Sequence, residues 1–276
     1  MSKCVIEIEN ASDGGRSVRV ELAFDDEGSG PAVVFLHGYP FNRTMWREQV
    51  EALKGRNRVV AVDLRGHGES EVTDGVVTMD DMARDVKALM DRLAIKRTAL
   101  VGLSMGGYVA LAFCRLFATS IRAVILADTR AQADTDEAKA NRAAQVETVL
   151  HEGMQAIADA MLPKLLSPET LSSQPDLVAR VRKMMMTTDP KGAAAALRGM
   201  AMRQDFRSFV STILAPTLLL VGSNDSITPV EDSEFMHREI GGSRLEILQG
   251  AAHLSNLERP DQFNAALLDF LRGIEV

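Results

Sequence analysis

The feature that most constrains the fold is a glycine-rich segment between a predicted strand and a predicted helix. It reads Gly-Leu-Ser-Met-Gly-Gly and occupies residues 102–107. Residues 98–101 suit a buried strand, and the apolar residues of 105–117 recur at helical spacing. A strand that passes directly into a helix needs small residues at the turn, which the glycines of this segment provide. The segment therefore predicts a tight junction that holds Ser104 at the edge of a sheet.

Strands and helices alternate along most of the chain. Predicted strands lie at residues 4–9, 16–24, 32–36, 59–62, 98–101, 123–127, 217–221 and 245–248. Helical patterns include residues 44–53, 105–117 and a final helix that begins at Pro260. Such alternation predicts an α/β fold: an eight-stranded, mostly parallel sheet with helices on both faces. We expect the first two strands to form an antiparallel hairpin at its edge.

One long stretch interrupts the alternation after the sixth strand. Residues 130–203 contain no strand signal. Amphipathic helical patterns are found instead near 137–151, 153–166, 175–186 and 190–202. An insertion at this point would lie above the carboxyl edge of the sheet, where open α/β folds bind ligands. We therefore expect an all-helical cap at 130–203 on a core domain made of residues 1–129 and 204–276.

Charge and composition exclude several classes of protein. Lys and Arg number 31 against 38 Asp and Glu, so the net charge of −7 offers no basic surface for nucleic acid. Apolar runs such as 213–221 are too short to cross a bilayer, and the start MSKCVIEIEN lacks the pattern of a secretory signal. Cys4 and Cys114 match no zinc-site spacing and are expected to be free thiols. We expect a cytoplasmic protein without a metal.

The serine in the glycine-rich junction is a candidate nucleophile. The pattern G-x-S-x-G, placed between strand and helix, lifts the Ser104 hydroxyl clear of the sheet. The helix that follows directs its first N–H groups toward the place where negative charge would develop. The alternative is a plain glycine-rich turn with an incidental serine.

A second donor for that negative charge is expected after the strand at 32–36. The segment His37-Gly38-Tyr39-Pro40 follows it directly. Tyr39 would offer its backbone N–H beside that of Met105, whereas Pro40 has no N–H to donate. The two N–H groups would form an oxyanion hole. The alternative is an ordinary turn built from glycine and proline.

A nucleophilic serine needs a base, and five histidines are available: His37, His67, His151, His237 and His253. His253 alone follows the last strand, from where a loop can bring its imidazole over Ser104. We expect His37 to brace the oxyanion loop.

A carboxylate is needed to orient the base. Asp225 follows the strand at 217–221 and Asp128 follows the strand at 123–127. The order Ser, acid, His requires a carboxylate before His253, a condition that both meet; we expect Asp225, with Asp128 as the alternative. The pair Thr228-Pro229 is expected to cap the next helix.

These segments together resemble the α/β-hydrolase family. The matching segments occur in the family's order: His37-Gly38-Tyr39-Pro40, Asp63-Leu64-Arg65-Gly66-His67-Gly68, residues 102–107, residues 222–225 with Thr228-Pro229, and residues 250–253 with Glu258-Arg259-Pro260. The chain looks like the capped serine carboxylesterase and lactonase branch, near the 3-oxoadipate enol-lactonase-like proteins. The resemblance covers roughly residues 16–130 and 204–274 and implies a triad of Ser104, His253 and Asp225. Epoxide hydrolases and haloalkane dehalogenases carry Asp where this chain has Ser104.

The expected function is hydrolysis of esters or lactones of small carboxylic acids through an acyl-enzyme, without a cofactor. The expected partner is a small-molecule substrate, and the oligomeric state is left open. Two alternatives remain: a carbon–carbon bond hydrolase for dienone-type substrates, and a non-catalytic ligand-binding receptor on the same fold. The cap carries no recognisable motif, so substrate identity does not follow from the fold.

Overall fold

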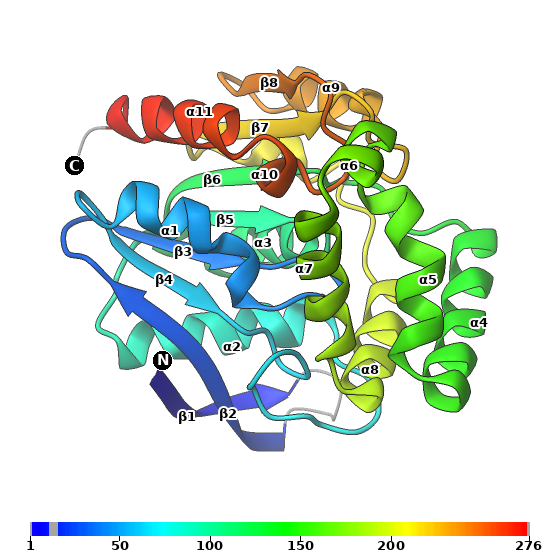
Figure 1. Ribbon diagram of the computed structural model, residues 1–276. Helices are drawn as coiled ribbons and strands as arrows, with labels where there is room; N and C mark the ends of the chain where they lie inside the picture. Colours follow the sequence, from blue (N-terminus) through cyan, green and yellow to red (C-terminus); the bar gives the residue numbers. More distant parts are fainter. Residues whose placement is uncertain (1, 11–15, 275–276) are drawn as a thin grey trace.

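The structure is a computed structural model that describes residues 2–10 and 16–274. Within these residues, one sheet has the strand order β1-β2-β4-β3-β5-β6-β7-β8 (Figure 1). The strands are β1 (Ser2–Asn10), β2 (Arg16–Glu27), β3 (Ala32–Leu36), β4 (Arg58–Val62), β5 (Thr98–Leu103), β6 (Ile121–Ala127), β7 (Thr217–Gly222) and β8 (Arg244–Leu248). Strands β3 to β8 are parallel, and β1 and β2 form the antiparallel edge. The predicted sheet is confirmed.

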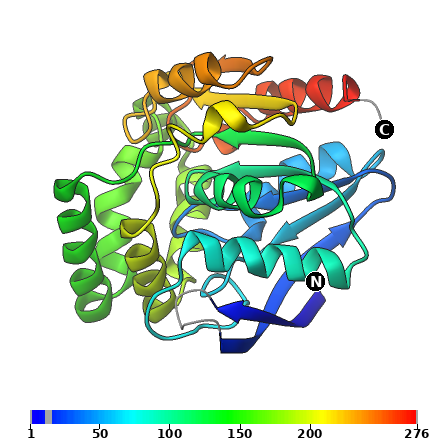
Figure 2. The ribbon, with the colours of Figure 1, turned by 180° about the vertical axis from the view of Figure 1, so that it is seen from behind.

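The sheet is covered on both faces. Helices α1 (Arg47–Leu53) and α11 (Pro260–Arg272) lie on the near face in Figure 1, while α2 (Met79–Arg92) and α3 (Met105–Phe117) lie on the face seen in Figure 2. Every residue of β5 and β7 is buried as a result. This double cover explains why the central strands read as apolar runs without alternation.

Five helices stand between β6 and β7, beyond the carboxyl ends of the parallel strands (Figure 1). They are α4 (Asp136–Glu152), α5 (Met154–Leu165), α6 (Pro168–Ser173), α7 (Pro175–Met186) and α8 (Pro190–Ala201). We call them the cap helices. The short helix α6 was not expected; Ser167 caps its first turn and Pro168 opens it. No helix in the described part of the chain is long and apolar enough to cross a membrane.

Helix α8 packs directly on the loop that follows β4. A Cβ atom added to Gly192 would lie 2.0 Å from the carbonyl oxygen of Gly66, so the two backbones touch. One turn further along, the Val77 N–H donates to the Ala195 carbonyl at 3.2 Å. Small residues on α8 therefore allow this cap helix to rest on the core without an intervening layer of side chains.

The loop after β4 owes its shape to buried ion pairs. Arg65 donates two hydrogen bonds to the Asp85 carboxylate, at 2.9 and 2.5 Å, and both side chains are buried. Asp63 accepts hydrogen bonds from the Arg43 backbone and guanidinium. Charges this deep are stable only when paired and hydrogen-bonded. The segment containing Asp63 and Arg65 thus has a structural role.

Candidate active site

Ser104 lies at the sharp junction between β5 and α3. Its backbone has φ 55° and ψ −114°, a strained conformation for a residue with a side chain. A Cβ on Gly102 would lie 2.2 Å from the Gly106 carbonyl oxygen, and one on Gly106 would lie 2.1 Å from that of Leu36. Only glycine fits at either position, so the chain can pass from strand to helix without a spacer. The junction leaves Ser104 half-buried.

Three side chains from three different loops form one hydrogen-bonded chain. The Nε2 atom of His253 lies 2.8 Å from the Ser104 hydroxyl, and its Nδ1 atom lies 2.8 Å from Oδ2 of Asp225. His253 follows β8, Asp225 follows β7 and Ser104 follows β5, so all three stand at the carboxyl edge of the sheet. Since Asp225 accepts from Nδ1–H, Nε2 of the neutral imidazole is the acceptor that faces Ser104.

Asp225 accepts hydrogen bonds from two backbone N–H groups and a hydroxyl of its own loop. Its Oδ1 atom accepts from the backbone N–H groups of Ile227 and Thr228, and its Oδ2 atom accepts from the Thr228 hydroxyl at 2.7 Å. Burial raises the pKa of Asp225, but the adjacent His253 and the Thr228 hydrogen bonds outweigh burial and bring the pKa below its ordinary value. The carboxylate is therefore ionised beside the imidazole.

The expectation that Thr228 caps the following helix is wrong. Helix α9 (Val230–Glu239) has Pro229 at its N-cap and no side-chain cap hydrogen bond. The helix begins one residue later than expected, and the Thr228 hydroxyl instead donates to the ionised Asp225 carboxylate, a strong charge-assisted bond. The signal that could have revealed this role is the three-residue spacing between the two side chains within one tight turn.

Asp128, the alternative acid, has other partners. Its Oδ1 atom accepts from the Gly222 N–H at 2.9 Å and its Oδ2 atom accepts from the Ser255 hydroxyl at 2.5 Å. Burial, followed by the nearby charge of Asp225, raises the pKa of Asp128 well above its usual value. Asp128 thus fixes the loops after β7 and β8 and makes no hydrogen bond to His253.

The loop after β3 lies against Ser104. A Cβ added to Gly38 would lie 3.3 Å from the Cβ of Ser104, which brings the next residue, Tyr39, beside the nucleophile candidate. In the described part of the chain, neither the Tyr39 N–H nor the Met105 N–H donates to a protein acceptor. Both donors remain available to a ligand. This arrangement is the one expected of an oxyanion hole.

His37 braces that loop from inside the protein. Its Nδ1–H donates to the Gly38 carbonyl, and its Nε2 atom accepts from the Leu64 N–H, both at 2.9 Å. Burial lowers the pKa of His37 to about 4, which keeps the imidazole neutral. A neutral ring can both donate and accept, so it links the loop after β3 to the loop after β4.

The three remaining histidines are bonded elsewhere. His67 is buried and donates from Nδ1 to the Arg65 carbonyl, and burial lowers its pKa to about 3. His237 pairs with the Ser243 hydroxyl, and His151 is exposed on α4. His253 is therefore the histidine that the fold brings to Ser104.

The cap helices are tied to both sides of the site by contacts that the sequence did not reveal. On one side, the Thr188 hydroxyl donates to the Pro40 carbonyl at 2.8 Å. On the other, the buried Glu258 accepts from the Ala252 N–H at 2.7 Å and from the Ser167 N–H at 2.9 Å. Glu258 thus joins the loop that carries His253 to the segment between α5 and α6.

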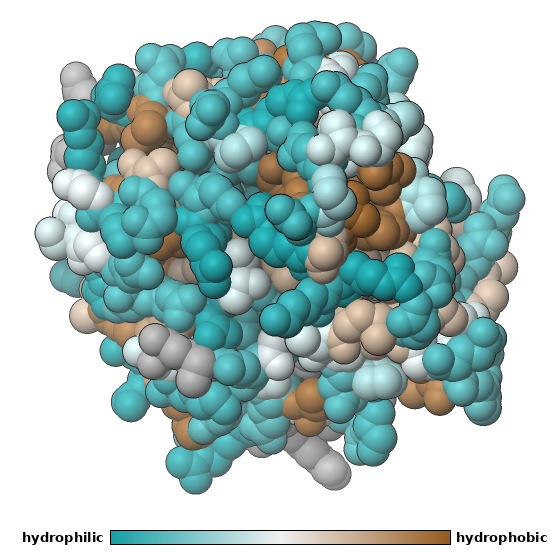
Figure 3. Space-filling model, viewed as in Figure 1, coloured by the Kyte–Doolittle hydropathy of each residue, from teal (hydrophilic) through white to brown (hydrophobic). Residues whose placement is uncertain are grey.

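No group of three or more His, Cys, Asp or Glu side chains in the described ranges is arranged to hold a metal ion. The site consists of a hydroxyl, an imidazole and a buried carboxylate in series, and the loop that carries the Tyr39 N–H packs against the serine. Such an arrangement can remove a proton from the hydroxyl and stabilise an oxyanion. Figure 3 shows that the face seen in Figure 1 is mostly hydrophilic, with apolar side chains gathered near α5 and α6.

Comparison with known proteins gives consistent matches over nearly the whole chain. Residues 31–260 match the family model described as the alpha/beta hydrolase fold. The 3-oxoadipate enol-lactonase 1 of Acinetobacter baylyi is 30% identical over 95% of this chain and 95% of its own. These matches agree with the resemblance drawn from the sequence segments.

Two solved structures are also similar. A thermophilic esterase from Thermogutta terrifontis, with malate bound, is 40% identical and has a TM-score of 0.94. The match covers 99% of this chain and 100% of the esterase chain. The enol-lactonase from Burkholderia xenovorans is 32% identical with a TM-score of 0.87, over 92% of this chain and 97% of its own.

Proposed function

Because the chain belongs to the α/β-hydrolase family and is an esterase- and lactonase-like hydrolase, we propose that it cleaves carboxylic esters or lactones through a serine acyl-enzyme. The observation that carries the proposal is the unbroken series Ser104–His253–Asp225, with 2.8 Å at each step. Ser104 is the nucleophile, His253 the general base and acid, and Asp225 the residue that orients the imidazole.

The first half-reaction forms the acyl-enzyme. Nε2 of His253 takes the hydroxyl proton as Oγ of Ser104 attacks the carbonyl carbon. The carbonyl oxygen becomes an oxyanion that accepts hydrogen bonds from the N–H groups of Tyr39 and Met105. Collapse of this intermediate breaks the C–O bond, and His253 passes its proton to the departing alkoxide. With a lactone, the departing hydroxyl stays attached to the acyl group.

The second half-reaction releases the acid. His253 takes a proton from water, and the resulting hydroxide attacks the acyl carbon. The new oxyanion occupies the same pair of N–H groups. Ser104 then leaves and recovers its proton from His253, which returns the site to its starting state. Asp225 stays ionised throughout and stabilises the imidazolium that forms twice per cycle.

For substrates, we propose esters of short acyl chains, roughly C2 to C6, or small lactones, because added methylenes overpack a pocket of fixed depth at about 1–3 kcal/mol each. Residues 130–203 act as the cap that limits this depth. The bonds from Thr188 to Pro40 and from Ser167 to Glu258 support the idea, since they fasten the cap on both sides of the site. The names of the lactonase and esterase relatives agree with both substrate types.

The test is kcat/KM across nitrophenyl esters from acetate to palmitate, together with a panel of small lactones. The proposal expects a maximum at short chains and a steep fall beyond them. A maximum at C10 or longer would contradict a closed site and indicate an open groove. Hydrolysis of dienone carbon–carbon bonds in preference to every ester would show that the same residues serve carbon–carbon bond hydrolysis.

A further inference from the structure

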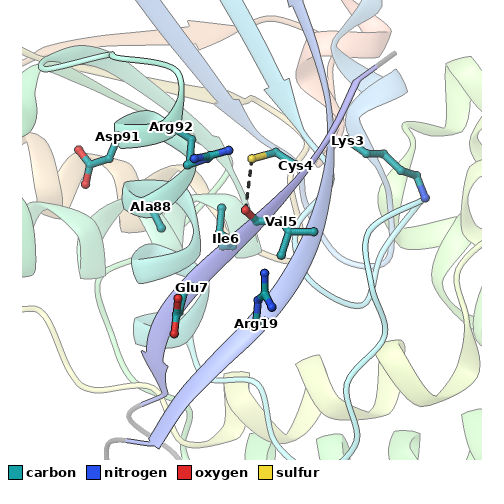
Figure 4. A pocket seen from close by; sticks show the side chains of 9 residues that line it. All are labelled: Lys3, Cys4, Val5, Ile6, Glu7, Arg19, Ala88, Asp91 and Arg92. Carbon is teal, nitrogen blue, oxygen red and sulfur yellow. Dashed lines mark hydrogen bonds between the residues drawn. The ribbon is translucent and has the colours of Figure 1, made fainter.

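The N-terminal strand β1 forms one edge of the sheet. It pairs with β2 on one side, and no strand in the described part of the chain pairs with its other side. A hollow of about 780 Å³ runs along this edge, between β1 and helix α2. Figure 4 shows the side chains that line this hollow. Its floor includes Ala88, and Asp91 and Arg92 flank it from α2. A nine-residue edge strand of this kind is a template for pairing with another chain.

The direction of the backbone groups of β1 follows from the bonds that β2 makes. Val5 lies opposite Glu21, and Glu21 uses both its N–H and its C=O for bonds to Glu71 on the far side of β2. In an antiparallel ladder, two opposite residues either bond to each other through their N–H and C=O groups or both direct these groups away from each other. Val5 therefore directs its N–H and C=O out of the sheet.

Lys3, two residues away from Val5, has the same orientation. Lys3 lies opposite Ala23, whose N–H donates to the Ser70 hydroxyl and whose C=O accepts from the Asp63 N–H. Lys3 therefore also points its backbone groups outward. The Val5 carbonyl is contacted weakly by the Cys4 thiol at 3.5 Å (Figure 4).

The side chains of β1 fall into two sets. Lys3 is 41% exposed and Val5 is 47% exposed, and Glu7 lies on the same outer face. Cys4 and Ile6 point to the inner face, against α2, and Ile6 is buried. The outer face thus reads cation, apolar residue, anion at alternate positions.

We propose that two copies of this chain pair through β1, antiparallel and centred on Val5, to form one continuous sheet. In this register Val5 lies opposite Val5 of the second copy, and the outward N–H and C=O groups of both meet. Lys3 lies opposite Glu7 of the second copy, twice by symmetry, and Cys4 lies opposite Ile6. The hollow beside β1 then lies along the line where the two copies meet.

Charge favours this register over others. Charged residues on an edge strand normally prevent pairing, but here the two signs are placed so that antiparallel pairing about Val5 joins opposite charges. Parallel in-register pairing would place Lys3 on Lys3 and Glu7 on Glu7. Lys3 already donates to Glu21 at 3.0 Å within the chain, and an ammonium group has three donors, so it can keep this bond.

The test is the mass in solution, measured by light scattering on a size-exclusion column between about 1 and 100 μM, where a micromolar dimer dissociates. Any purification tag is placed at the C-terminus, away from β1. We expect a concentration-dependent shift toward twice the 30.0 kDa chain mass. Val5→Pro should be monomeric throughout, because proline removes an outward N–H without breaking a bond to β2. Val5→Thr, which keeps the N–H, should still dimerise.

A charge exchange tests the register. Lys3→Glu and Glu7→Lys should each weaken the dimer at least tenfold, and the double variant should restore it. Glu21→Gln, which removes the partner of Lys3 within the chain, should dimerise normally. Thermal unfolding by circular dichroism verifies that each variant is folded. A wild-type monomer at every concentration, a dimer that persists in Val5→Pro, or a double variant that stays monomeric would overturn the proposal.

Discussion

The hydroxyl of Thr228 and the Nδ1–H of His253 converge on the same oxygen atom of Asp225. Oδ2 of Asp225 lies 2.7 Å from Thr228 Oγ1 and 2.8 Å from His253 Nδ1. The bond from His253 orients the imidazole, and the bond from Thr228 fixes the Asp225 oxygen that accepts it. Thr228 is therefore a positioning residue for the proposed base, one step removed from the reacting atoms.

Thr228→Val should weaken catalysis while leaving substrate binding largely intact. Valine keeps the shape of threonine but removes one of the bonds that keep the Asp225 pKa low. The expected loss in kcat is on the order of tenfold, the cost of about one hydrogen bond to a charged group. Thr228→Ser should recover most of it. Equal rates in Val, Ser and wild type would show that the hydroxyl does not act on Asp225.

Asp225→Asn and Asp128→Asn should differ sharply. Loss of the Asp225 carboxylate favours the wrong imidazole tautomer and should lower kcat on the order of 10⁴-fold, as in the known serine triad. Asn at 128 can still accept from the Gly222 N–H and bond to the Ser255 hydroxyl, so its effect should be under tenfold. The measurement is kcat on a nitrophenyl ester. A larger loss of kcat in Asp128→Asn than in Asp225→Asn would show that the acid is Asp128, which follows β6.

Glu258→Gln should loosen the loop that carries His253. The two Glu258 oxygens accept from Ala252 and Ser167, and a glutamine amide can supply only one acceptor. One buried N–H is then unsatisfied, which costs about 1–3 kcal/mol of unfolding free energy. Denaturant unfolding measures this loss. The exposed Glu169→Gln, which removes only an ion pair with Arg259, serves as the control and should change stability by less than about 1 kcal/mol.

Two buried histidines should contribute less to stability as the pH drops below neutral, because burial makes both resist protonation. Burial lowers the pKa of His37 to about 4 and that of His67 to about 3, against 6.5 in the unfolded chain. Between pH 6.5 and these values the two histidines bind more protons in the unfolded state, so their contribution to stability rises with pH in that window and is constant above it. The contributions are on the order of a few kcal/mol each.

The measurement is the urea midpoint at pH 7, 6, 5 and 4. His67→Asn, which keeps a donor near the position of Nδ1, should make the pH dependence shallower by about one proton. His151→Asn removes an exposed histidine and is the matched control. A pH dependence in His67→Asn equal to that of the wild type would contradict the assignment of a neutral, buried His67 ring.

The sheet was predictable because each strand carries a local signal. The buried strands read as apolar runs, and the glycines at 102 and 106 mark a junction too tight for side chains. Strand β2 extends past the predicted residue 24 because 24–27 pair with β4, and such a partner is not visible in the local pattern. The helix expected at 44–53 begins as a 3₁₀ turn, Arg43–Trp46, since Asn42 caps it through Thr44.

The positioning contacts of the site could not be predicted in the same way. Glu258 and Ser167 are 91 residues apart, and Thr188 and Pro40 are 148 apart. Bonds of this kind depend on how the cap lies on the core, which no local period encodes. Asp225 and Asp128 both follow strands, and only the position of His253 distinguishes them.

The most direct test of the proposed mechanism is to locate the residue that an active-site phosphonate modifies. The protein is treated with a fluorophosphonate, digested, and analysed by mass spectrometry, with hydrolysis of nitrophenyl acetate followed in parallel. We predict one label per chain, on Ser104, with activity lost in proportion. Ser104→Ala should take no label, unfold at the wild-type temperature, and lose several orders of magnitude in kcat. A label on another serine, or wild-type activity in Ser104→Ala, would contradict the mechanism.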